Sequence, residues 1–313
     1  MKNKILLLIP LLLSFIGCSN KTSSTTIQKE STSTSNQMVN KNVDVIVLCG
    51  QSNAEGHTWT NELIKNIDKT TAKKYINGFD NFKIRFNCSN GLNKNNDFSN
   101  VKLGEGVSVN QFGPEIGICD YLDSVHSYLE NDIYIIKYAV GGTSLYYNWR
   151  STSSSNENNN VGDLYTNLIN YIDESIDLLK NQDLIPNIKA ICWMQGESDS
   201  NSMASSFYEE LENNFINDLS YHIEEKQNTK VSFLSAGISN CPNWDQYYKV
   251  INTAKYNNSL KDNEYRYYID TIKEKLEYSK EPISNPDINH YDSLSMIKLG
   301  NLFAKTLFDN AII

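Results

Sequence analysis

The sequence is poor in the residues that build metal and redox sites. Its 313 residues include four histidines and six cysteines, and no CxxC pair, Cys/His cluster or HExxH run occurs. Because those spacings are the usual signals for zinc ligands and redox dithiols, we expect no metal site. A P-loop and a GxGxxG run are also missing, so the sequence gives no support for nucleotide binding. We therefore expect a protein that works without a cofactor.

Positive charge is scarce as well. Acidic residues outnumber basic ones and give a formal net charge of −9, and only three of the basic residues are arginines. A nucleic-acid-binding protein needs a basic surface to neutralise phosphates, so we expect no nucleic-acid partner. No motif indicates a protein partner either.

Long apolar runs are missing apart from a short one near the N-terminus. Lys2 and Lys4 precede an apolar run at 5–17, and Cys18 follows it directly. This run is shorter than the ~20 apolar residues of a membrane span. A basic start before a short apolar core is typical of a secretory signal. The stretch SFIGC (14–18) resembles a bacterial lipoprotein cleavage box, although Phe15 stands where Leu is usual.

This pattern predicts a lipoprotein signal peptide over 1–17, with Cys18 as the lipidated residue. A simple cleaved signal and an uncleaved anchor are the alternatives. The expected location is the bacterial cell envelope, lipid-anchored on the extracytoplasmic side, or secretion. The membrane would then be contacted only through the N-terminal lipid.

The segment after the signal has hardly any apolar residue. Residues 19–42 are mainly Ser, Thr, Asn and Lys, and such a stretch cannot bury enough surface to offset its ordering entropy. We predict a flexible tether over 18–42 and one folded domain over 43–313. Length alone would allow two domains, but no second low-complexity linker occurs. The polar stretch at 151–160 lies inside the motif-bearing region and is predicted to be a surface loop.

The rest of the chain alternates between two patterns. Short apolar or β-rich runs, typical of buried parallel strands, lie at 43–48, 133–140, 188–194, 231–236 and 265–270. Helical periodicity covers 114–130, 163–181, 207–226 and 293–308, with Pro114 suited to a first helical turn. The alternation predicts an α/β fold, a three-layer α/β/α sandwich with a mainly parallel central sheet.

Small and polar residues cluster where three of these predicted strands end. GQSNAEG (50–56) follows the first strand, GGTSLYYNW (141–149) the second and QGESD (195–199) the third, and NPDINHYD (285–292) precedes the last helix. Sites on parallel sheets gather at the carboxyl ends of the strands, so we expect these segments to meet. Gly, Ser and Asn are also ordinary turn residues, so each motif is weak alone. Their combination and order indicate a site.

Acyl transfer by an activated serine fits these residues. Ser52 needs a base to remove its proton, and the base needs an acid that fixes its tautomer. His290 and Asp287 suit those roles, because a turn after Pro286 can bring both side chains to the same side. Asp287 would bind Nδ1 and leave Nε2 for Ser52. His57 has no obvious acid partner, and the two remaining histidines lie within predicted helices.

An oxyanion hole needs N–H donors aimed where negative charge develops. The candidates are the backbone N–H of Ser52, that of a glycine at 141 or 142, and the side-chain amide of Gln195. A plain turn at the two glycines and a strand-end hydrogen bond at Gln195 are equally open alternatives.

The motifs resemble those of the SGNH-hydrolase superfamily, and more narrowly its sialate O-acetylesterase and acetylxylan esterase branch. GQSNAEG, FGPEIG (112–117), KYAVGGTSL (137–145), WMQGESD (193–199) and DINH (287–290) occur in this order, with Trp149 after the third. The resemblance spans about 43–308 and implies a flavodoxin-like fold. Ala54 replaces the second glycine of the GxSxG elbow, which disfavours a lipase of the α/β-hydrolase fold.

The resemblance also implies roles for the site residues. Ser52 would be the nucleophile, and Asp287 and His290 would complete the triad. Ser52, Gly142 and Gln195 would form the oxyanion hole. Gln195 stands where the wider superfamily has Asn, which is usual in this branch.

The implied function is a carbohydrate O-acetylesterase, a serine hydrolase that removes acetyl groups from acetylated sugars through an acetyl-serine intermediate. One alternative is a carbohydrate-binding lipoprotein that keeps the fold without turnover, although Ser52, Asp287 and His290 are all intact. The other is an esterase or thioesterase for lipid or small acyl esters. Few long apolar stretches occur outside the predicted strands and helices, which speaks mildly against an acyl-chain tunnel.

Substrate contacts are expected at Gln51, Asn53, Trp149, Arg150 and Glu197. Trp149, together with Tyr146 and Tyr147, would either stack on a sugar ring or pack against the domain. A structural role is favoured for Glu197. Arg150 could bind the carboxylate of a sialic or uronic acid with two hydrogen bonds, or lie in solvent. The negative net charge favours a neutral acetylated polysaccharide, with sialic acid as the close rival.

Overall fold

A mainly parallel β-sheet forms the centre of this protein, whose computed structural model describes residues 40–155 and 160–313. The predicted signal peptide (1–17), Cys18 and almost all of the predicted tether (18–42) lie outside the described residues. The first strand, β1, begins at Lys41, slightly ahead of the domain boundary predicted at 43.

The sheet has the strand order β10-β9-β8-β1-β7-β3-β4, with β5 paired to β3. All pairs from β10 to β3 are parallel, whereas β4 and β5 pair antiparallel to β3. The strands are β1 (Lys41–Gly50), β3 (Phe79–Cys88), β4 (Asn93–Lys94), β5 (Ser99–Val101), β7 (Asp132–Ala139), β8 (Leu184–Met194), β9 (Ser232–Ala236) and β10 (Arg266–Ile269). A separate two-stranded sheet joins β2 (Thr58–Trp59) to β6 (Gln111–Phe112).

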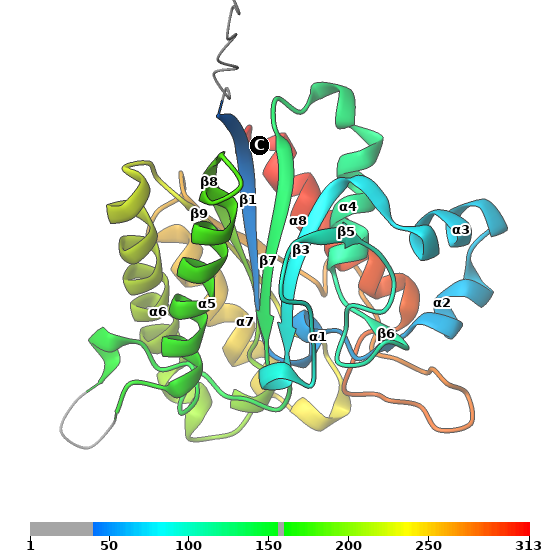
Figure 1. Ribbon diagram of the computed structural model, residues 1–313. Helices are drawn as coiled ribbons and strands as arrows, with labels where there is room; N and C mark the ends of the chain where they lie inside the picture. Colours follow the sequence, from blue (N-terminus) through cyan, green and yellow to red (C-terminus); the bar gives the residue numbers. More distant parts are fainter. Residues whose placement is uncertain (1–39, 156–159) are drawn as a thin grey trace, which may run out of the picture. The chain divides into compact units, whose positions relative to one another are not determined.

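Helices cover both faces of the sheet (Figure 1). Arg85 of β3 reaches Ser175 on α5 (Asp163–Lys180), whereas Lys137 of β7 reaches Glu115 on α4 (Glu115–Ser124). Arg85 pairs in register with Ile136, the neighbour of Lys137, so α5 and α4 lie on opposite faces. On the α5 side, α6 (Ala204–Gln227) packs against β8 and β9, and α7 (Tyr247–Leu260) packs on α6. On the other side, α8 (Ser293–Asp309) packs against α4.

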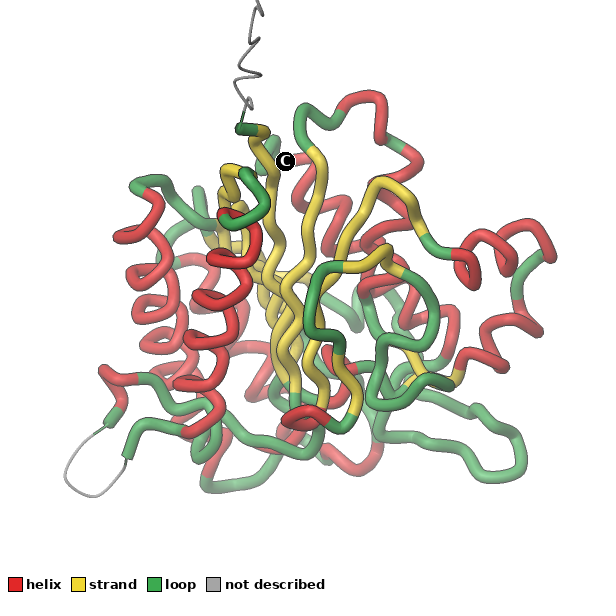
Figure 2. The backbone as a smooth tube through the Cα atoms, in the orientation of Figure 1, coloured by secondary structure: helices red, strands yellow, loops and turns green. Residues whose placement is uncertain are grey.

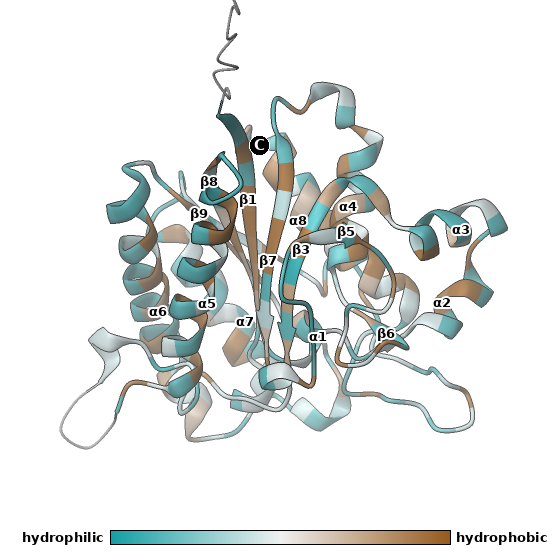
Figure 3. Cartoon of the chain, viewed as in Figure 1, coloured by the Kyte–Doolittle hydropathy of each residue, from teal (hydrophilic) through white to brown (hydrophobic). Residues whose placement is uncertain are grey.

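Three short helices lie between β1 and β3 in the chain. They are α1 (Ser52–Glu55), α2 (Thr60–Asn66) and α3 (Lys69–Asn77). Figure 2 shows the strands as one central layer with helices before and behind it, and Figure 3 shows apolar residues concentrated along that layer. Every residue of β1 from Val43 to Gly50 is buried, because helices cover both faces.

The predicted α/β/α sandwich is confirmed. All five predicted strands and four predicted helices are present, although α4 ends at Ser124 rather than at 130. The sequence reasoning missed β3, whose run FDNFKIRFNC carries Lys83 and Arg85 and so differs from a wholly apolar buried strand. It also missed α2, α3 and α7.

The order of the strands determines where a site can form. The chain runs from β1 past the position of β7 to β3, returns to β7, and then crosses to β8 on the other side of β1. A crevice opens at the carboxyl end of the strand where the winding direction changes, and here that strand is β1. Figure 1 shows β1, β7 and β3 ending together beside α1.

Two further observations concern cysteines and membranes. Cys49, Cys88, Cys119, Cys192 and Cys241 are all free and buried. In the described part of the chain, no helix combines the length and apolar character needed to cross a bilayer.

Candidate active site

The predicted nucleophile lies directly after the carboxyl end of β1. Gly50 has φ +139°, and a Cβ there would lie 2.0 Å from the carbonyl oxygen of Met194, so only glycine fits this close approach to β8. The next residue, Gln51, donates its backbone N–H to the same carbonyl at 3.0 Å. The chain then turns into α1, which begins with Ser52, a residue 7 % exposed.

Asp287 and His290 form the carboxylate–imidazole pair predicted from DINH. His290 Nδ1 lies 2.7 Å from Asp287 Oδ2. This hydrogen bond outweighs burial and lowers the pKa of Asp287, so the carboxylate is ionised and accepts the Nδ1 hydrogen. Among the described residues His290 Nε2 has no hydrogen-bond partner, and its lone pair is available for a proton.

Asn53 joins the nucleophile segment to the histidine segment. Its side-chain Oδ1 accepts the backbone N–H of Tyr291 at 3.1 Å, and its Nδ2 donates to Glu197 Oε1 at 2.7 Å. Asn53 is 1 % exposed, so it has almost no surface for a sugar. The expected substrate contact is therefore replaced by a bond that places Ser52 beside the loop carrying His290.

Two backbone N–H groups fit an oxyanion hole. Within residues 40–155 and 160–313, the amides of Ser52 and Gly142 have no hydrogen-bond acceptor. Gly142 adopts φ +70°, and a Cβ built there would meet no atom within 4 Å. Unpaired backbone N–H groups are the donors that a developing oxyanion needs.

Gln195 faces the protein interior, contrary to its expected place in the oxyanion hole. It is 0 % exposed, and its two amide hydrogens serve three internal acceptors: Asp199 Oδ2 at 2.5 Å, and Gln51 Oε1 and Thr143 O, each at 3.1 Å. Its Oε1 accepts the hydroxyl of Tyr208 at 2.9 Å. These contacts leave no N–H free for substrate, and they tie β8 to the Gly142 loop.

Gln51 is also an internal residue, 2 % exposed. Its Oε1 accepts the amide of Gln195 and the backbone N–H groups of Gly196 and Ser198, at 3.1, 3.3 and 3.2 Å. Gln51 was expected to contact the sugar, but it is buried and holds the loop after β8 instead.

Asp199 binds the loop that follows β7, and it does not bind a histidine. Its carboxylate accepts the backbone N–H groups of Leu145 and Tyr146 at 2.8 and 3.0 Å, in addition to the Gln195 amide. Burial raises the pKa of Asp199 despite these bonds. The geometry therefore assigns Asp287, not Asp199, as the acid partner of the base.

Two of the expected sugar contacts are used within the protein. Trp149 is 0 % exposed, and its indole N–H donates to Thr143 Oγ1 at 2.8 Å, so it has no free face for stacking. Arg150 is 7 % exposed and lies over the Tyr146 ring, with its guanidinium carbon 4.9 Å from the centroid. Its Nε and Nη2 donate to Tyr146 O at 3.0 and 2.5 Å, and Nη1 donates to Ser154 O at 3.2 Å.

Aromatic surface is instead offered beside Trp149. Tyr147 is 62 % exposed and meets Tyr146 edge-on, with ring centroids 4.7 Å apart. Phe207 of α6, 47 % exposed, lies 5.7 Å from Tyr146 between centroids. Tyr146, Tyr147 and Phe207 form what we call the aromatic patch. Phe207 was missed because its helix carried no motif.

Glu197 is buried, and only one of its two carboxyl oxygens has a hydrogen-bond partner among the described residues. Its Oε1 accepts the Asn53 amide, but its Oε2 has no partner within residues 40–155 and 160–313. Burial raises the pKa of Glu197, which favours the neutral acid. The structural role favoured for Glu197 agrees with these contacts.

The site also contains residues that the sequence reasoning did not use. His57, judged to lack an acid partner, has one in Glu55, whose Oε2 lies 2.8 Å from His57 Nε2. The His57 ring stacks on the His290 ring, with centroids 4.5 Å apart and planes inclined by 23°. Glu55 lies inside the GQSNAEG motif, two residues before His57, so the acid was visible in the sequence.

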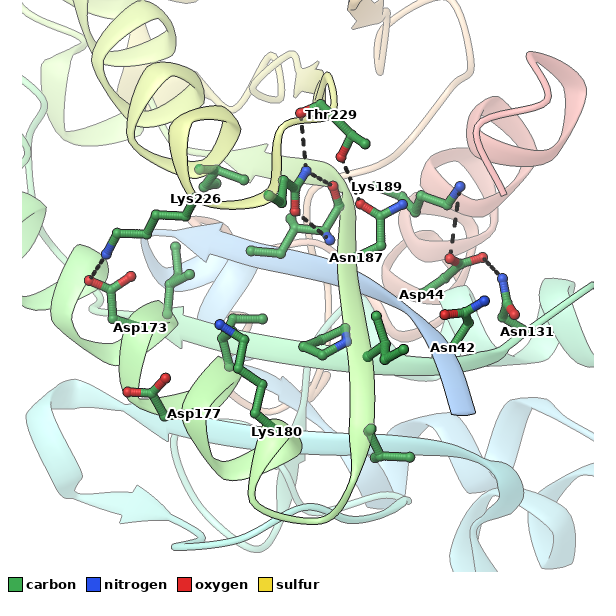
Figure 4. A pocket seen from close by; sticks show the side chains of 18 of the residues that line it. Asn42, Asp44, Asn131, Asp173, Asp177, Lys180, Asn187, Lys189, Lys226 and Thr229 are labelled. Atoms are coloured by element: carbon green, nitrogen blue, oxygen red, sulfur yellow. Dashed lines mark hydrogen bonds and ion pairs between the residues drawn. The ribbon is translucent and has the colours of Figure 1, made fainter. Parts of the chain in front are cut away.

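A cavity lies at the other end of the sheet, where the strands begin. This cavity of about 830 Å³ borders the starts of β1 and β8 and helices α5 and α6, and includes Asn42, Asp44 and Lys226 (Figure 4). Two ion pairs lie along it: Lys226 is 2.6 Å from Asp173, and Lys189 is 3.8 Å from Asp44. No predicted site residue lines it.

Among the described residues, no three His, Cys, Asp or Glu side chains gather in a way that could hold a metal ion.

Comparison with known proteins gives a consistent result. A family model described as "Carbohydrate esterase, sialic acid-specific acetylesterase" matches residues 42–309. No curated protein matches the chain.

Three solved structures share the fold. An Arabidopsis thaliana protein is 17 % identical with a TM-score of 0.60, and the match covers 85 % of this chain and 98 % of that one. NanS is 14 % identical with a TM-score of 0.60, and the match covers 87 % of this chain and 98 % of NanS. A carbohydrate acetylesterase from Xanthomonas citri is 14 % identical with a TM-score of 0.55, covering 86 % of this chain and 56 % of that one.

Proposed function

This chain belongs to the carbohydrate esterase family of sialic acid-specific acetylesterases, and from that premise we propose that it is a serine O-acetylesterase whose triad is Ser52, His290 and Asp287. The observation that carries the proposal is the 2.7 Å bond between Asp287 and His290, on a loop that Asn53 holds against the nucleophile segment. The resemblance to sialate and acetylxylan esterases agrees with the family.

In the first half-reaction, Ser52 Oγ attacks the acetyl carbonyl carbon and its proton moves to His290 Nε2. The carbonyl oxygen becomes an oxyanion, which the backbone N–H groups of Ser52 and Gly142 are placed to bind. Asp287 stabilises the imidazolium that forms. The ester C–O bond then breaks, and the departing sugar oxygen takes the proton from Nε2, leaving acetyl-serine.

The second half-reaction reverses these proton movements. Nε2 of His290 takes a proton from water, and the hydroxide attacks the acetyl carbon of acetyl-Ser52. When the second oxyanion collapses, Ser52 Oγ leaves and recovers the proton from Nε2. Acetate is released and the enzyme returns to its initial state.

For the sugar, we favour a neutral acetylated carbohydrate over a sialic acid. Arg150 is the residue expected to bind a carboxylate. Each of its three guanidinium nitrogens instead donates a hydrogen bond to the backbone carbonyl of Tyr146 or Ser154. The other two arginines are engaged as well: Arg85 Nη1 donates to Ser175, and Arg266 Nη1 to Asn213. The family description, in contrast, names sialic acid.

The two substrate classes are separated by measuring acetate release. The panel would contain acetylated xylan, acetylated N-acetylhexosamines and O-acetylated sialic acids, each tested with the wild type and Arg150→Ala. We expect turnover of the neutral substrates and little change in Arg150→Ala on them. Selective turnover of the acidic sugar, lost in Arg150→Ala, would instead establish the sialate specificity.

Turnover itself is tested with a fluorophosphonate probe. We expect Ser52 to be labelled, and Ser52→Ala to lose both the label and the hydrolysis of 4-nitrophenyl acetate. Full activity in Ser52→Ala would remove the esterase mechanism, and a folded wild type without any hydrolysis would favour the carbohydrate-binding alternative.

We also propose that Cys18 carries a lipid and holds the enzyme in the cell envelope. The proposal is supported by the basic, apolar and SFIGC segments of residues 1–18. β1 starts at Lys41, so the tether would join the domain at the strand end opposite Ser52. Labelling with an alkyne fatty acid in a bacterial host should mark the wild type and not Cys18→Ser, and equal labelling of both would contradict the anchor.

A further inference from the structure

The buried carboxylate of Glu55 contacts two parts of the site at once. Its Oε2 lies 2.8 Å from His57 Nε2 and accepts the backbone N–H of Gly141 at 2.8 Å. Its Oε1 accepts the hydroxyl of Ser89 at 2.6 Å. Glu55 is 0 % exposed, and Gly141 precedes Gly142, whose backbone N–H has no acceptor among the described residues. One oxygen of Glu55 therefore binds both the oxyanion loop and His57.

His57 in turn contacts the catalytic base. The two imidazole rings stack at 4.5 Å, whereas the bond from Asp287 meets His290 in the plane of its ring. The segment carrying His57 is fixed on both sides: Gln111 Nε2 donates to His57 O at 2.8 Å, and Thr58 Oγ1 donates to Tyr291 O at 3.0 Å. His57 is thus held against the histidine loop.

We propose that Glu55 is a positioning residue that aligns the base, through His57, with the oxyanion loop, through Gly141. The inference rests on the proposed esterase function and adds two residues to it. A hydrogen bond in the ring plane prevents His290 from swinging away from Asp287 but permits a tilt about that bond. A ring stacked on its face opposes the tilt, so Asp287 and His57 constrain His290 in different directions.

The carboxylate is the group that this arrangement needs. Burial would raise the pKa of Glu55, but hydrogen bonds from His57, Ser89 and Gly141 outweigh it and lower the pKa. Glu55 is therefore ionised and acts only as an acceptor, which suits three converging donors. An amide in its place would keep one acceptor oxygen and turn N–H hydrogens toward donors.

The direct test is Glu55→Gln, assayed with an aryl acetate and an acetylated sugar. We expect kcat to fall by about 10²-fold with KM within about twofold of the wild type, because small misplacements of catalytic groups cost rate and not binding. The matched control is Asp173→Asn, which removes a carboxylate paired with His222 far from β1's carboxyl end. Its kcat should match the wild type.

Variants of His57 test the ring contact while the Glu55 side chain stays in place, and both variants remove the hydrogen bond from His57 to Glu55. Its side chain is 24 % exposed, so substitution leaves no large cavity. His57→Ala should lower kcat about tenfold, and His57→Phe, which keeps a flat ring against His290, should recover part of that loss. The double variant Glu55→Gln, His57→Ala should be no slower than Glu55→Gln, because both act through one contact network.

The outcomes separate this inference from the esterase proposal. If Ser52→Ala retains activity, the mechanism itself fails. If Ser52 and His290 are essential but Glu55→Gln and His57→Ala keep wild-type kcat, the positioning role is wrong and Glu55 serves folding only. A rise in KM at constant kcat would also overturn it. If Glu55→Gln does not fold, the split between His57→Ala and His57→Phe decides.

Discussion

Asn53 Oδ1 accepts the backbone N–H of Tyr291 at 3.1 Å, so the residue after the proposed nucleophile holds the residue after the proposed base. The two residues are 238 positions apart in the chain, and both are buried. The bond fixes the loop of His290 relative to α1, on which the geometry between Ser52 and Nε2 depends.

Asn53→Ala should therefore lower kcat by about 10²-fold with KM little changed, since the serine and the base lose their alignment. It should also cost about 1–3 kcal/mol of unfolding free energy, because the Tyr291 amide and Glu197 Oε1 lose a partner. Steady-state kinetics and urea denaturation measure the two effects. A stability loss without a kcat loss would reduce Asn53 to a folding role.

The acid of the triad is the subject of a second prediction. Asp287→Asn should lower kcat roughly 10³–10⁴-fold with the fold retained, because the amide stabilises the wrong tautomer of His290. His290→Ala should cost about as much as losing Ser52, since the two act as a unit. Asp199→Asn is the control, and a crippled control beside a normal Asp287→Asn would reverse the assignment.

A third prediction tests whether Gln195 donates to the oxyanion or only links parts of the structure. From its contacts, Gln195→Ala should lower the unfolding free energy by about 1–3 kcal/mol, because Thr143 O loses its hydrogen-bond donor and the side chains of Gln51 and Asp199 each lose one of theirs. A fall in kcat of roughly 10²–10³-fold at unchanged stability would instead support the donor role implied by the resemblance. Thermal melts and kinetics on one preparation decide between them.

The aromatic patch should matter for sugars and not for small esters. Tyr147→Ala and Phe207→Ala should each raise KM for an acetylated polysaccharide by about three- to tenfold, the range of a lost aromatic contact. Hydrolysis of 4-nitrophenyl acetate should be unchanged. Tyr221→Ala, equally exposed on α6, is the matched control. Equal effects on both substrates would show a loss of structure.

Glu55 and Glu197 should respond to pH in opposite directions. The pKa of Glu55 is lowered by folding, so its stabilisation is present above the unfolded pKa of about 4.3 and is lost as pH falls. The stability gap between wild type and Glu55→Gln should therefore narrow on acidification from about pH 6 to pH 3. The pKa of Glu197 is raised by burial, so ionising it costs stability in the folded wild type. The stability of Glu197→Gln should therefore increase relative to that of the wild type as pH rises. Denaturant titrations across pH measure both.

The sequence by itself determined the fold class and the candidate residues of the chemistry. Apolar runs alternating with helical periodicity are local patterns, and burial on both faces of a parallel sheet imposes them directly. Ser52 and the Asp287–His290 pair were visible because strand ends and a three-residue spacing restrict where such groups can act. β3 was not predicted, because Lys83 and Arg85 interrupt its apolar pattern and their partners are brought near only by the folded structure.

Only the tertiary structure decided which polar residues face substrate and which face the protein. Gln195, Trp149 and Arg150 belong to promising motifs, yet each directs its hydrogen bonds inward to partners that other strands and loops supply. His57 gained its role through Glu55 and the stack on His290, a residue 233 positions away. Burial and side-chain direction depend on contacts between segments distant in the chain, and a linear pattern contains no record of them.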